Sequence, residues 1–191
     1  METASIPDHK ESSSMNQTAY QLKMSVYTAL FIALIAIGAF ISIPIGPVPI
    51  VLQNMFVLLS AILLGPAWGS GCIAIYLLIG LAGLPVFAGG TSGIGKLFGP
   101  TGGYLVSYLP AAFVTAAVSK GLGRKLYGDI IAMLVGALII YAVGVPWLKA
   151  VTGMTFEKAV AVGMFPFLIG DAVKITAAAF IAKTIRPIAR F

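Results

Sequence analysis

The chain has 191 residues, of which 59% are hydrophobic and only 9% are charged, and its formal net charge is +6. A soluble domain carries about a quarter charged residues, so this composition excludes a large water-exposed domain and indicates a polytopic membrane protein. At roughly 20 residues per spanning helix, the length allows about six spans in one all-α domain. Cys72 and His9 are the only residues of their kinds, which argues against thiol or multi-histidine metal sites and against histidine-dependent catalysis.

The N-terminal stretch differs in composition from the rest of the chain. Residues 1–14 are polar and end in three successive serines. We expect them to be either a leader that precedes a natural start at Met15 or a short native disordered tail. Residues 15–191 are expected to form a single membrane domain of six helices.

The apolar segments predict where the spans lie. Proline and glycine turns interrupt the apolar sequence at Pro44–Pro49 and at Gly65-Pro66, and a long glycine-rich connection runs from Pro85 to Gly103. Basic or polar turns separate the remaining segments. The expected spans cover residues 25–43, 50–64, 67–84, 104–118, 130–148 and 159–182.

The distribution of lysine and arginine predicts the orientation of a six-span chain. The two termini and the turn after the fourth span would share one side of the membrane, and that side would carry eight of these residues. The opposite side would carry three, at Lys96, Lys149 and Lys158. The positive-inside rule therefore places both termini in the cytoplasm and the glycine-rich connection outside. The net positive charge then reflects this bias rather than nucleic-acid binding.

Asp171 and Lys174 are the only charged residues deep inside a predicted span. A single charge at the bilayer centre costs about 2.5–3.5 kcal/mol on insertion scales. A spacing of three places both side chains on one face of a helix, where each neutralises the other. A carboxylate that accepts and an ammonium that donates complement a neutral group such as a urea. Two alternatives are a purely structural salt bridge and a proton relay, although no second buried carboxylate or histidine is available to continue a relay.

The glycine-rich connection holds seven glycines within fifteen residues, from Gly89 to Gly103. Such a segment can bring backbone N–H groups close to a ligand. Its apolar side chains favour a folded lid over a flexible surface loop. It lacks the Ser or Thr that follows the lysine of a Walker A motif. Lys96 either faces an anionic group of a ligand or lies in solvent.

Two further groups have both a structural and a functional interpretation. Gln53 and Asn54 lie at the start of the second predicted span, where both suit helix capping. For Gln53 the alternative is that it reaches inward to the cavity that Asp171 would face. Ala29 and Ala33 are four residues apart in the first span, and this small-xxx-small spacing lets another helix approach closely. Alanine is common in this chain, so the spacing is weak evidence by itself.

Four sequence runs together resemble those of the BioY family. They are GPVPIVLQN (residues 46–54), GLPVFAGG (83–90), GPTGGYL (99–105) and PFLIGDAVK (166–174). They occur in the family's order, and the resemblance covers nearly everything from about Tyr20 onward. It implies a biotin-specific substrate-binding (S) component of an energy-coupling factor (ECF) transporter: a six-helix bundle with an outward-facing vitamin pocket in the cell membrane. It also implies a transmembrane T component and two ATP-binding subunits as partners, and no enzymatic activity.

The resemblance also suggests roles for individual residues. The ureido ring of biotin would meet Asp171 and Lys174, and its carboxylate would meet Lys96 or amides of the glycine-rich connection. Ala29 and Ala33 match an alanine motif with which this group contacts the T component. The predicted biotin-binding residues are Gln53, Gly90, Thr91, Lys96, Phe98, Tyr104, Tyr141, Trp147, Asp171 and Lys174.

Two rival functions remain to be compared with this one. A self-sufficient secondary transporter would show inverted repeats and coupling-ion ligands near the midplane, and we find no internal repeat. An intramembrane enzyme would need a nucleophile with a base, or a metal cluster, which one Asp-Lys pair does not supply. The sequence contains no ATP-binding motif, so dependence on ATP would come from partner subunits. We therefore expect no catalytic residues, no metal site and no cofactor of the chain's own.

Overall fold

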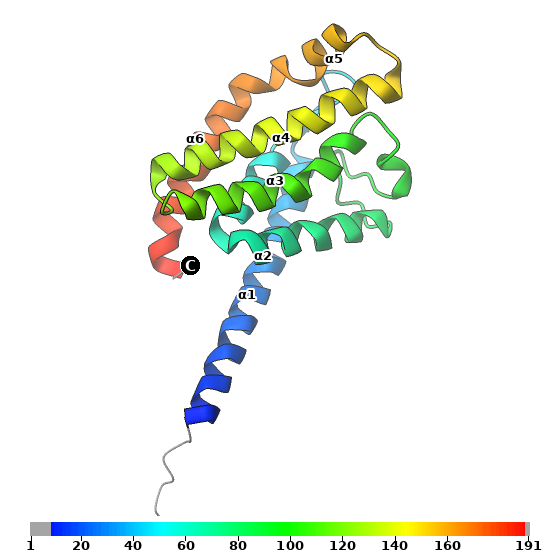
Figure 1. Cartoon of the computed structure of the whole chain (residues 1–191). Coiled ribbons are helices and arrows are strands. Elements are labelled where there is room, and N and C mark those ends of the chain that lie inside the picture. Colours follow the sequence, from blue (N-terminus) through cyan, green and yellow to red (C-terminus); the bar gives the residue numbers. More distant parts are fainter. Residues whose placement is uncertain (1–8, 190–191) are drawn as a thin grey trace, which may run out of the picture.

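The computed structural model describes residues 9–189 and consists almost entirely of helices (Figure 1). This confirms the predicted all-α membrane fold class. The α-helices are α1 (His9–Phe40), α2 (Gln53–Leu81), α3 (Gly102–Gly121), α4 (Leu126–Thr152), the short α5 (Phe156–Gly163) and α6 (Phe165–Ala189). Two short strands, β1 (Ser42–Ile43) and β2 (Ile50–Val51), and a 3₁₀-helix, η1 (Ile94–Lys96), lie in the connections. Because α1 begins at His9, only residues 1–8 of the predicted N-terminal tail lie outside the described residues.

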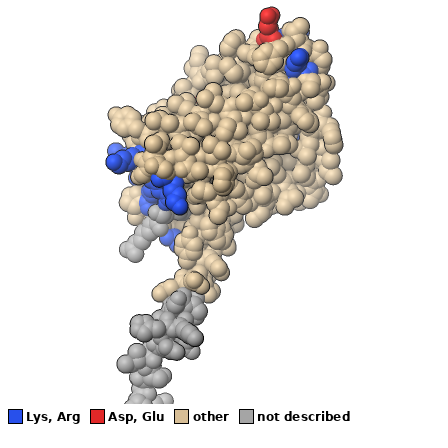
Figure 2. Space-filling view, in the orientation of Figure 1, with Lys and Arg blue, Asp and Glu red and all other residues tan. Residues whose placement is uncertain are grey.

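Five helical segments in the described part of the chain are long and apolar enough to cross a membrane. In Figure 2 the charged side chains gather at two opposite ends of the body, and a broad uncharged belt lies between them. A belt of this kind suits contact with lipid hydrocarbon. The predicted count of six spans is not confirmed, because the second and third predicted spans both fall within α2.

The backbone breaks inside α2, at Gly65. This residue has φ of 82° and ψ of 178°, which is not helical and which glycine alone adopts readily. The two parts of α2, residues 53–64 and 66–81, then fold back on each other. Gln53 hydrogen-bonds to Tyr76 over 2.9 Å, and a Cβ atom at Gly69 would lie 3.0 Å from the Ala61 Cα. The predicted turn at Gly65-Pro66 is therefore present as a sharp break within one helix.

A second break divides the predicted sixth span. We expected one continuous helix over residues 159–182, but α5 ends at Gly163 and α6 begins at Phe165. Met164, between them, has φ of −134° and ψ of −56°. Pro166 contributes to the difference, because its ring nitrogen has no hydrogen to continue the hydrogen bonding of α5.

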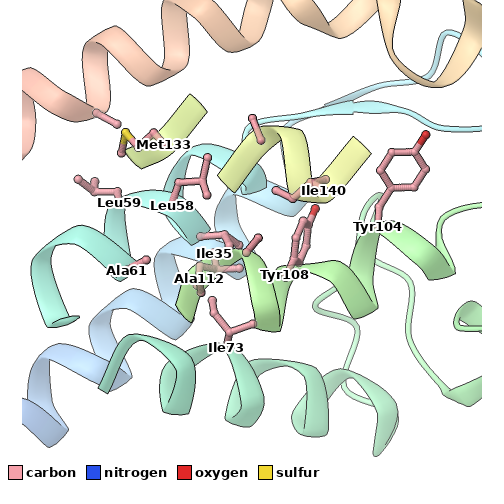
Figure 3. Close-up of a cluster of buried hydrophobic side chains, with 14 of the residues drawn as sticks. Ile35, Leu58, Leu59, Ala61, Ile73, Tyr104, Tyr108, Ala112, Met133 and Ile140 are labelled. Carbon is pink, nitrogen blue, oxygen red and sulfur yellow. The ribbon is translucent and has the colours of Figure 1, made fainter. Parts of the chain in front are cut away.

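The core of the bundle lies where α1, α2, α3 and α4 pack together. Buried aliphatic side chains such as Ile35, Leu58 and Ile140 meet small residues such as Ala112 of α3 (Figure 3). Tyr104 and Tyr108, one turn apart on α3, continue this core toward one end of the bundle. That end is closed by the β1–β2 hairpin, in which Ser42 pairs with Val51, and by the glycine-rich connection.

Phe87 anchors the glycine-rich connection to α2. Its ring is only 1% exposed and packs edge-on against Tyr76, with 5.8 Å between the ring centroids. The hydroxyl of Tyr76 donates to the Val86 carbonyl over 2.7 Å. A Cβ atom added at Gly80 would lie 2.2 Å from the Phe87 ring, so the absence of a side chain there makes the packing possible.

This contact predicts opposite effects for two glycines of the same helix. Gly80→Ala should lower the melting temperature by several degrees, because overpacking against Phe87 costs about 1–3 kcal/mol. Gly71→Ala is the matched control, since a Cβ atom there meets nothing within 4 Å. Alanine is the better helix former, so the control should be neutral or stabilising. Thermal unfolding of both variants in detergent measures this, and equal melting temperatures would contradict the proposed packing.

Candidate functional site

A cavity of about 460 Å³ lies at the end of the bundle that carries the hairpin and the glycine-rich connection. Its wall combines the proline turn before β2, the start of α2, the connection, α3, α4 and α6. Its volume is within the usual range for small-molecule sites. The aromatic lining residues are Phe87, Tyr104, Tyr108, Tyr141 and Phe167, and the polar ones include Gln53, Asn54, Thr91, Ser92, Lys96 and Thr101.

Asp171 and Lys174 form the predicted ion pair behind this cavity. The Lys174 Nζ lies 3.2 Å from Asp171 Oδ1, and both side chains are almost completely buried. Tyr141, which lines the cavity, donates its hydroxyl hydrogen to the other carboxylate oxygen of Asp171. The carboxylate thus accepts hydrogen bonds at both of its oxygens, which offsets part of the cost of burying its charge.

Lys174 also ties α6 to the beginning of α2. Its ammonium group donates to the backbone carbonyl of Val51 over 2.8 Å. Val51 lies just before the start of α2. In a regular helix its carbonyl would accept from the amide of Met55, but that amide donates to the Leu52 carbonyl. The Val51 carbonyl is therefore available to Lys174. Lys174 therefore positions the entry into α2 as well as neutralising Asp171.

The ion pair does not line the large cavity directly. It borders a second space of about 10 Å³, which is the room of roughly one water molecule. Asn54 and Tyr141 line both spaces, so these two side chains separate the ion pair from the large cavity. Asp171 and Lys174 thus lie one layer behind the cavity wall.

Of the two roles that the sequence left open for Gln53, the structure shows the inward-facing one. Gln53 is the first residue of α2, is 1% exposed and lines the cavity. Its amide nitrogen donates to the Tyr76 hydroxyl, which in turn donates to Val86. The side chain gives no helix-capping hydrogen bond at this terminus. Gln53 therefore links the cavity wall to the anchored start of the connection.

Two tyrosines of α3 fix neighbouring elements around the cavity. Tyr104 donates its hydroxyl hydrogen to the Gly163 carbonyl over 2.9 Å, at the break between α5 and α6. Tyr108 donates to the side-chain oxygen of Asn54. The second bond fixes the amide of Asn54, so that its NH₂ group remains the donor end of that side chain.

Besides the ion pair, three predicted binding residues do not line the cavity. Phe98 is 70% exposed, because it follows η1 on the outer side of the connection. Gly90 lies against the ring of Phe40. Trp147 instead donates its indole N–H to the Gly99 carbonyl over 3.1 Å and so holds the far end of the connection to α4. The remaining five predicted binding residues do line the cavity: Gln53, Thr91, Lys96, Tyr104 and Tyr141.

Several lining residues were absent from the predicted set. They include Asn54, which follows Gln53 in sequence, and Ser92, Tyr108 and Phe167. Tyr108 follows Tyr104 by four residues, so the spacing of one helical turn was a usable signal. No local pattern marks Ser92, because its position depends on how the connection folds.

Ala29 and Ala33 lie on α1 and are not among the residues that line the cavity. Both side chains are exposed, and Thr28 beside them is buried. The exposed face of α1 thus carries the small residues expected at a helix–helix contact.

The arrangement suits a small amphipathic ligand. Aromatic walls favour an apolar body, and Gln53, Asn54 and Tyr141 offer both donors and acceptors near the buried ion pair. Lys96 adds a cation on the connection. A ligand with a neutral hydrogen-bonding head, an apolar middle and an anionic group would be complementary to these features.

Comparisons with known proteins agree with this description. The BioY family model matches residues 10–191. The chain is 43% identical over 158 residues to the probable biotin transporter BioY of Pyrococcus horikoshii, which covers 83% of this chain and 93% of that protein. It is 41% identical over 166 residues to the biotin transporter BioY of Thermotoga maritima, covering 86% and 96%.

A solved structure has the same fold. The crystal structure of the S component for biotin from an ECF-type ABC transporter aligns with a TM-score of 0.84 at 32% identity, covering 88% of this chain and 93% of that one. The relatives are named as transporters, and the family is not a family of enzymes. The predicted resemblance is confirmed: this membrane protein belongs to the BioY family.

Proposed function

We propose that this chain binds biotin in the large cavity, as the S component of an ECF-type transporter. The observation that carries the proposal is the polar base of the cavity, where Tyr141 faces the ligand space and donates to the buried carboxylate of Asp171. The names of the relatives and of the structural neighbour support biotin as the ligand. Calorimetry of the purified chain with biotin, and with a second vitamin as the control, tests it directly.

The chemistry of biotin matches the cavity. Its ureido ring offers two N–H donors and one carbonyl, which complement the side chains of Asn54, Gln53 and Tyr141. Asp171 and Lys174 act on the ring from the layer behind, because they orient and polarise Tyr141 and set the charge of the base. The thiophane ring and valeryl chain of biotin would pack on the aromatic walls, and its carboxylate would meet Lys96, Thr91 or amides of the connection.

The assembly and its topology are part of the same proposal. We place the two halves of α2 as separate crossings, which gives six spans in the domain of residues 15–191, with both termini in the cytoplasm and the cavity outside. The antiparallel packing of the two halves supports this count.

The chain contains no ATP-binding motif, so a T component and two ATP-binding subunits would supply the energy. The exposed strip with Ala29 and Ala33 is the proposed contact with the T component.

The ion pair gives the first prediction. Asp171→Asn and Lys174→Ala should each weaken biotin binding by about 10- to 100-fold, while the protein still inserts and remains monodisperse. Removing one partner leaves the other charge buried and unpaired, which costs the folded protein about 3–5 kcal/mol. The expected loss of affinity corresponds to about 1.4–2.7 kcal/mol of this cost. Calorimetry measures the affinity. Thr176→Val, an exposed position on the same helix, is the control and should bind normally. Wild-type affinity in both ion-pair variants would remove the pair from the site.

The glycine-rich connection gives the second prediction. We expect it to close over bound biotin, because its ends are anchored by Phe87 and Trp147 while its middle carries Lys96 at the cavity wall. Hydrogen exchange in residues 91–98 should slow when biotin is added. The turn at residues 122–125 is the internal control and should exchange at the same rate. Equal rates in the connection with and without biotin would identify a plain surface loop.

The α1 strip gives the third prediction. Replacing Ala29 and Ala33 by tryptophan should leave biotin affinity within about threefold of wild type and abolish uptake. Large side chains would hold a partner helix away, and close approach in lipid depends on van der Waals packing. Biotin affinity in detergent and co-purification with the T component and ATP-binding subunits measure the two effects separately.

The matched control for this strip is tryptophan at Ala117 and Ala177, which are exposed on α3 and α6. The control should assemble and transport. If the Ala29 and Ala33 variant transports as well, the partner surface lies elsewhere. If that variant loses biotin binding instead, α1 is part of the cavity wall.

A further inference from the structure

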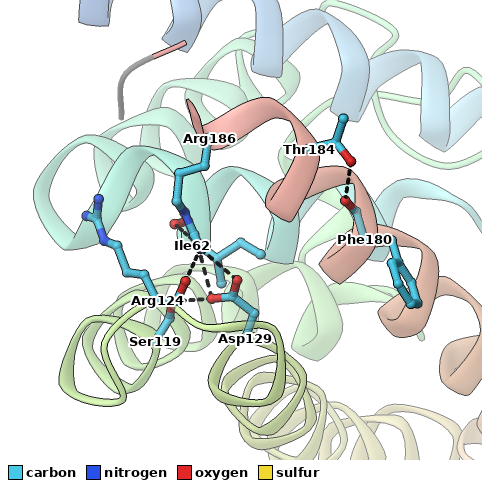
Figure 4. A network of polar contacts seen from close by, with 7 residues as sticks. All are labelled: Ile62, Ser119, Arg124, Asp129, Phe180, Thr184 and Arg186. Atoms are coloured by element: carbon cyan, nitrogen blue, oxygen red, sulfur yellow. Dashed lines mark hydrogen bonds and ion pairs between the residues drawn. The ribbon is translucent and has the colours of Figure 1, made fainter. Parts of the chain in front are cut away.

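A second buried ion pair lies at the end of the bundle opposite the cavity. Arg186, near the end of α6, contacts both carboxylate oxygens of Asp129, in the first turn of α4, at 2.9 and 3.1 Å (Figure 4). Asp129 is completely buried, and the side chain of Arg186 is 13% exposed. Asp129 also accepts the hydroxyl hydrogen of Ser119, at the end of α3. The pair therefore joins three helices, in a geometry that favours arginine over lysine.

Arg186 also reaches the break in α2. Its second guanidinium nitrogen donates to the Ile62 carbonyl over 3.2 Å. In an unbroken helix that carbonyl would accept the amide hydrogen of residue 66, which here is Pro66 and has none. A carbonyl left without a donor inside a bundle costs free energy. Arg186 thus supplies the hydrogen-bond donor that Pro66 lacks.

The turn between α3 and α4 takes part in the same cluster. Arg186 donates to the backbone carbonyl of Arg124. Arg124 is the one non-glycine residue with positive φ in the described chain, at 54°. This conformation directs its carbonyl toward α6, as the contact in Figure 4 shows. One guanidinium therefore satisfies a carboxylate and two backbone carbonyls from separate elements.

The pairing between the first half of α2 and α6 has two ends, and the same kind of interaction occurs at both. At the cavity end Lys174 pairs with Asp171 and donates to the Val51 carbonyl, and at the far end Arg186 pairs with Asp129 and donates to the Ile62 carbonyl. The two cations are twelve residues apart and the two carbonyls eleven. At about 1.5 Å per helical residue, both spacings correspond to roughly 17 Å. The first half of α2 and α6 therefore run side by side between two matching cation–carbonyl contacts.

We propose that Arg186 is a positioning residue that braces the α2 break, so that α6 and residues 53–64 form one rigid unit and Gly65 is the hinge beyond it. The brace fixes the position of the second half of α2, residues 66–81, and its loss lets that half move about Gly65. Cys72 lies in that half, fully buried, with its thiol directed at the Thr28 carbonyl of α1. Loss of the brace should loosen the packing of this half against α1.

The only cysteine of the chain reports on this loosening. We would measure the rate at which N-ethylmaleimide labels Cys72 in purified, detergent-solubilised protein, with the SDS-unfolded chain as the upper limit. Arg186→Met should raise the rate at least fivefold, because it removes every donor while keeping an apolar stem. Asp129→Asn should raise it less, since the guanidinium can still reach the Ile62 carbonyl. Lys183→Met, at an exposed position of the same helix, should label as slowly as wild type.

Arg186→Lys keeps the proposal testable if the methionine variant does not fold. A lysine can pair with Asp129 but cannot span the carboxylate and both carbonyls, so the labelling rate should exceed that of wild type. A melting temperature lowered by several degrees with an unchanged Cys72 rate in Arg186→Lys and Asp129→Asn would overturn the brace and leave only a stabilising ion pair. The readout needs no ligand, so it does not depend on biotin being the substrate.

Discussion

A helix that breaks inside a membrane leaves backbone carbonyls without donors, and hydrocarbon cannot replace them. At three helix breaks or helix starts in the described part of the chain, a side chain donates to such a carbonyl. The donor–carbonyl pairs are Lys174 with Val51, Arg186 with Ile62, and Tyr104 with Gly163. The two cations in this set need counter-charges of their own, which Asp171 and Asp129 provide. Much of the buried polarity of the bundle therefore follows from the need to satisfy its broken helices.

The same constraint explains where the cavity lies. Two of the three satisfied carbonyls, at Val51 and Gly163, lie at the cavity end, where the chain enters α2 and where α5 gives way to α6. Irregular backbone at these points leaves room that straight helices would fill. The residues that hold the breaks, Lys174 and Tyr104, consequently lie in or directly behind the cavity wall. Structural support and ligand recognition thus depend on the same side chains.

The sequence predicted those features that depend on composition and on spacing along one helix. It predicted the apolar segments, the break at Gly65-Pro66 and the contact between Asp171 and Lys174, because hydropathy and helical periodicity are local. It did not reveal the pairing of Asp129 with Arg186, because these residues are 57 positions apart. In the sequence, Asp129 lies in a predicted polar turn and Arg186 in the C-terminal tail. The sequence also assigned Phe98 to the wall, because an aromatic residue in a loop carries no sign of which way it faces.

The bond from Tyr104 to Gly163 has a consequence for selectivity. The phenol donates its hydroxyl hydrogen to the Gly163 carbonyl, so Tyr104 presents an apolar ring surface and no hydrogen-bond donor to the ligand space. A solute that placed a carbonyl against this wall would leave its water shell without finding a replacement donor on Tyr104. Leaving a polar group without a partner costs about 1–3 kcal/mol, which is a moderate discrimination of up to roughly 100-fold. The wall would therefore discriminate against oxygenated analogues of its ligand through desolvation, with no steric clash required.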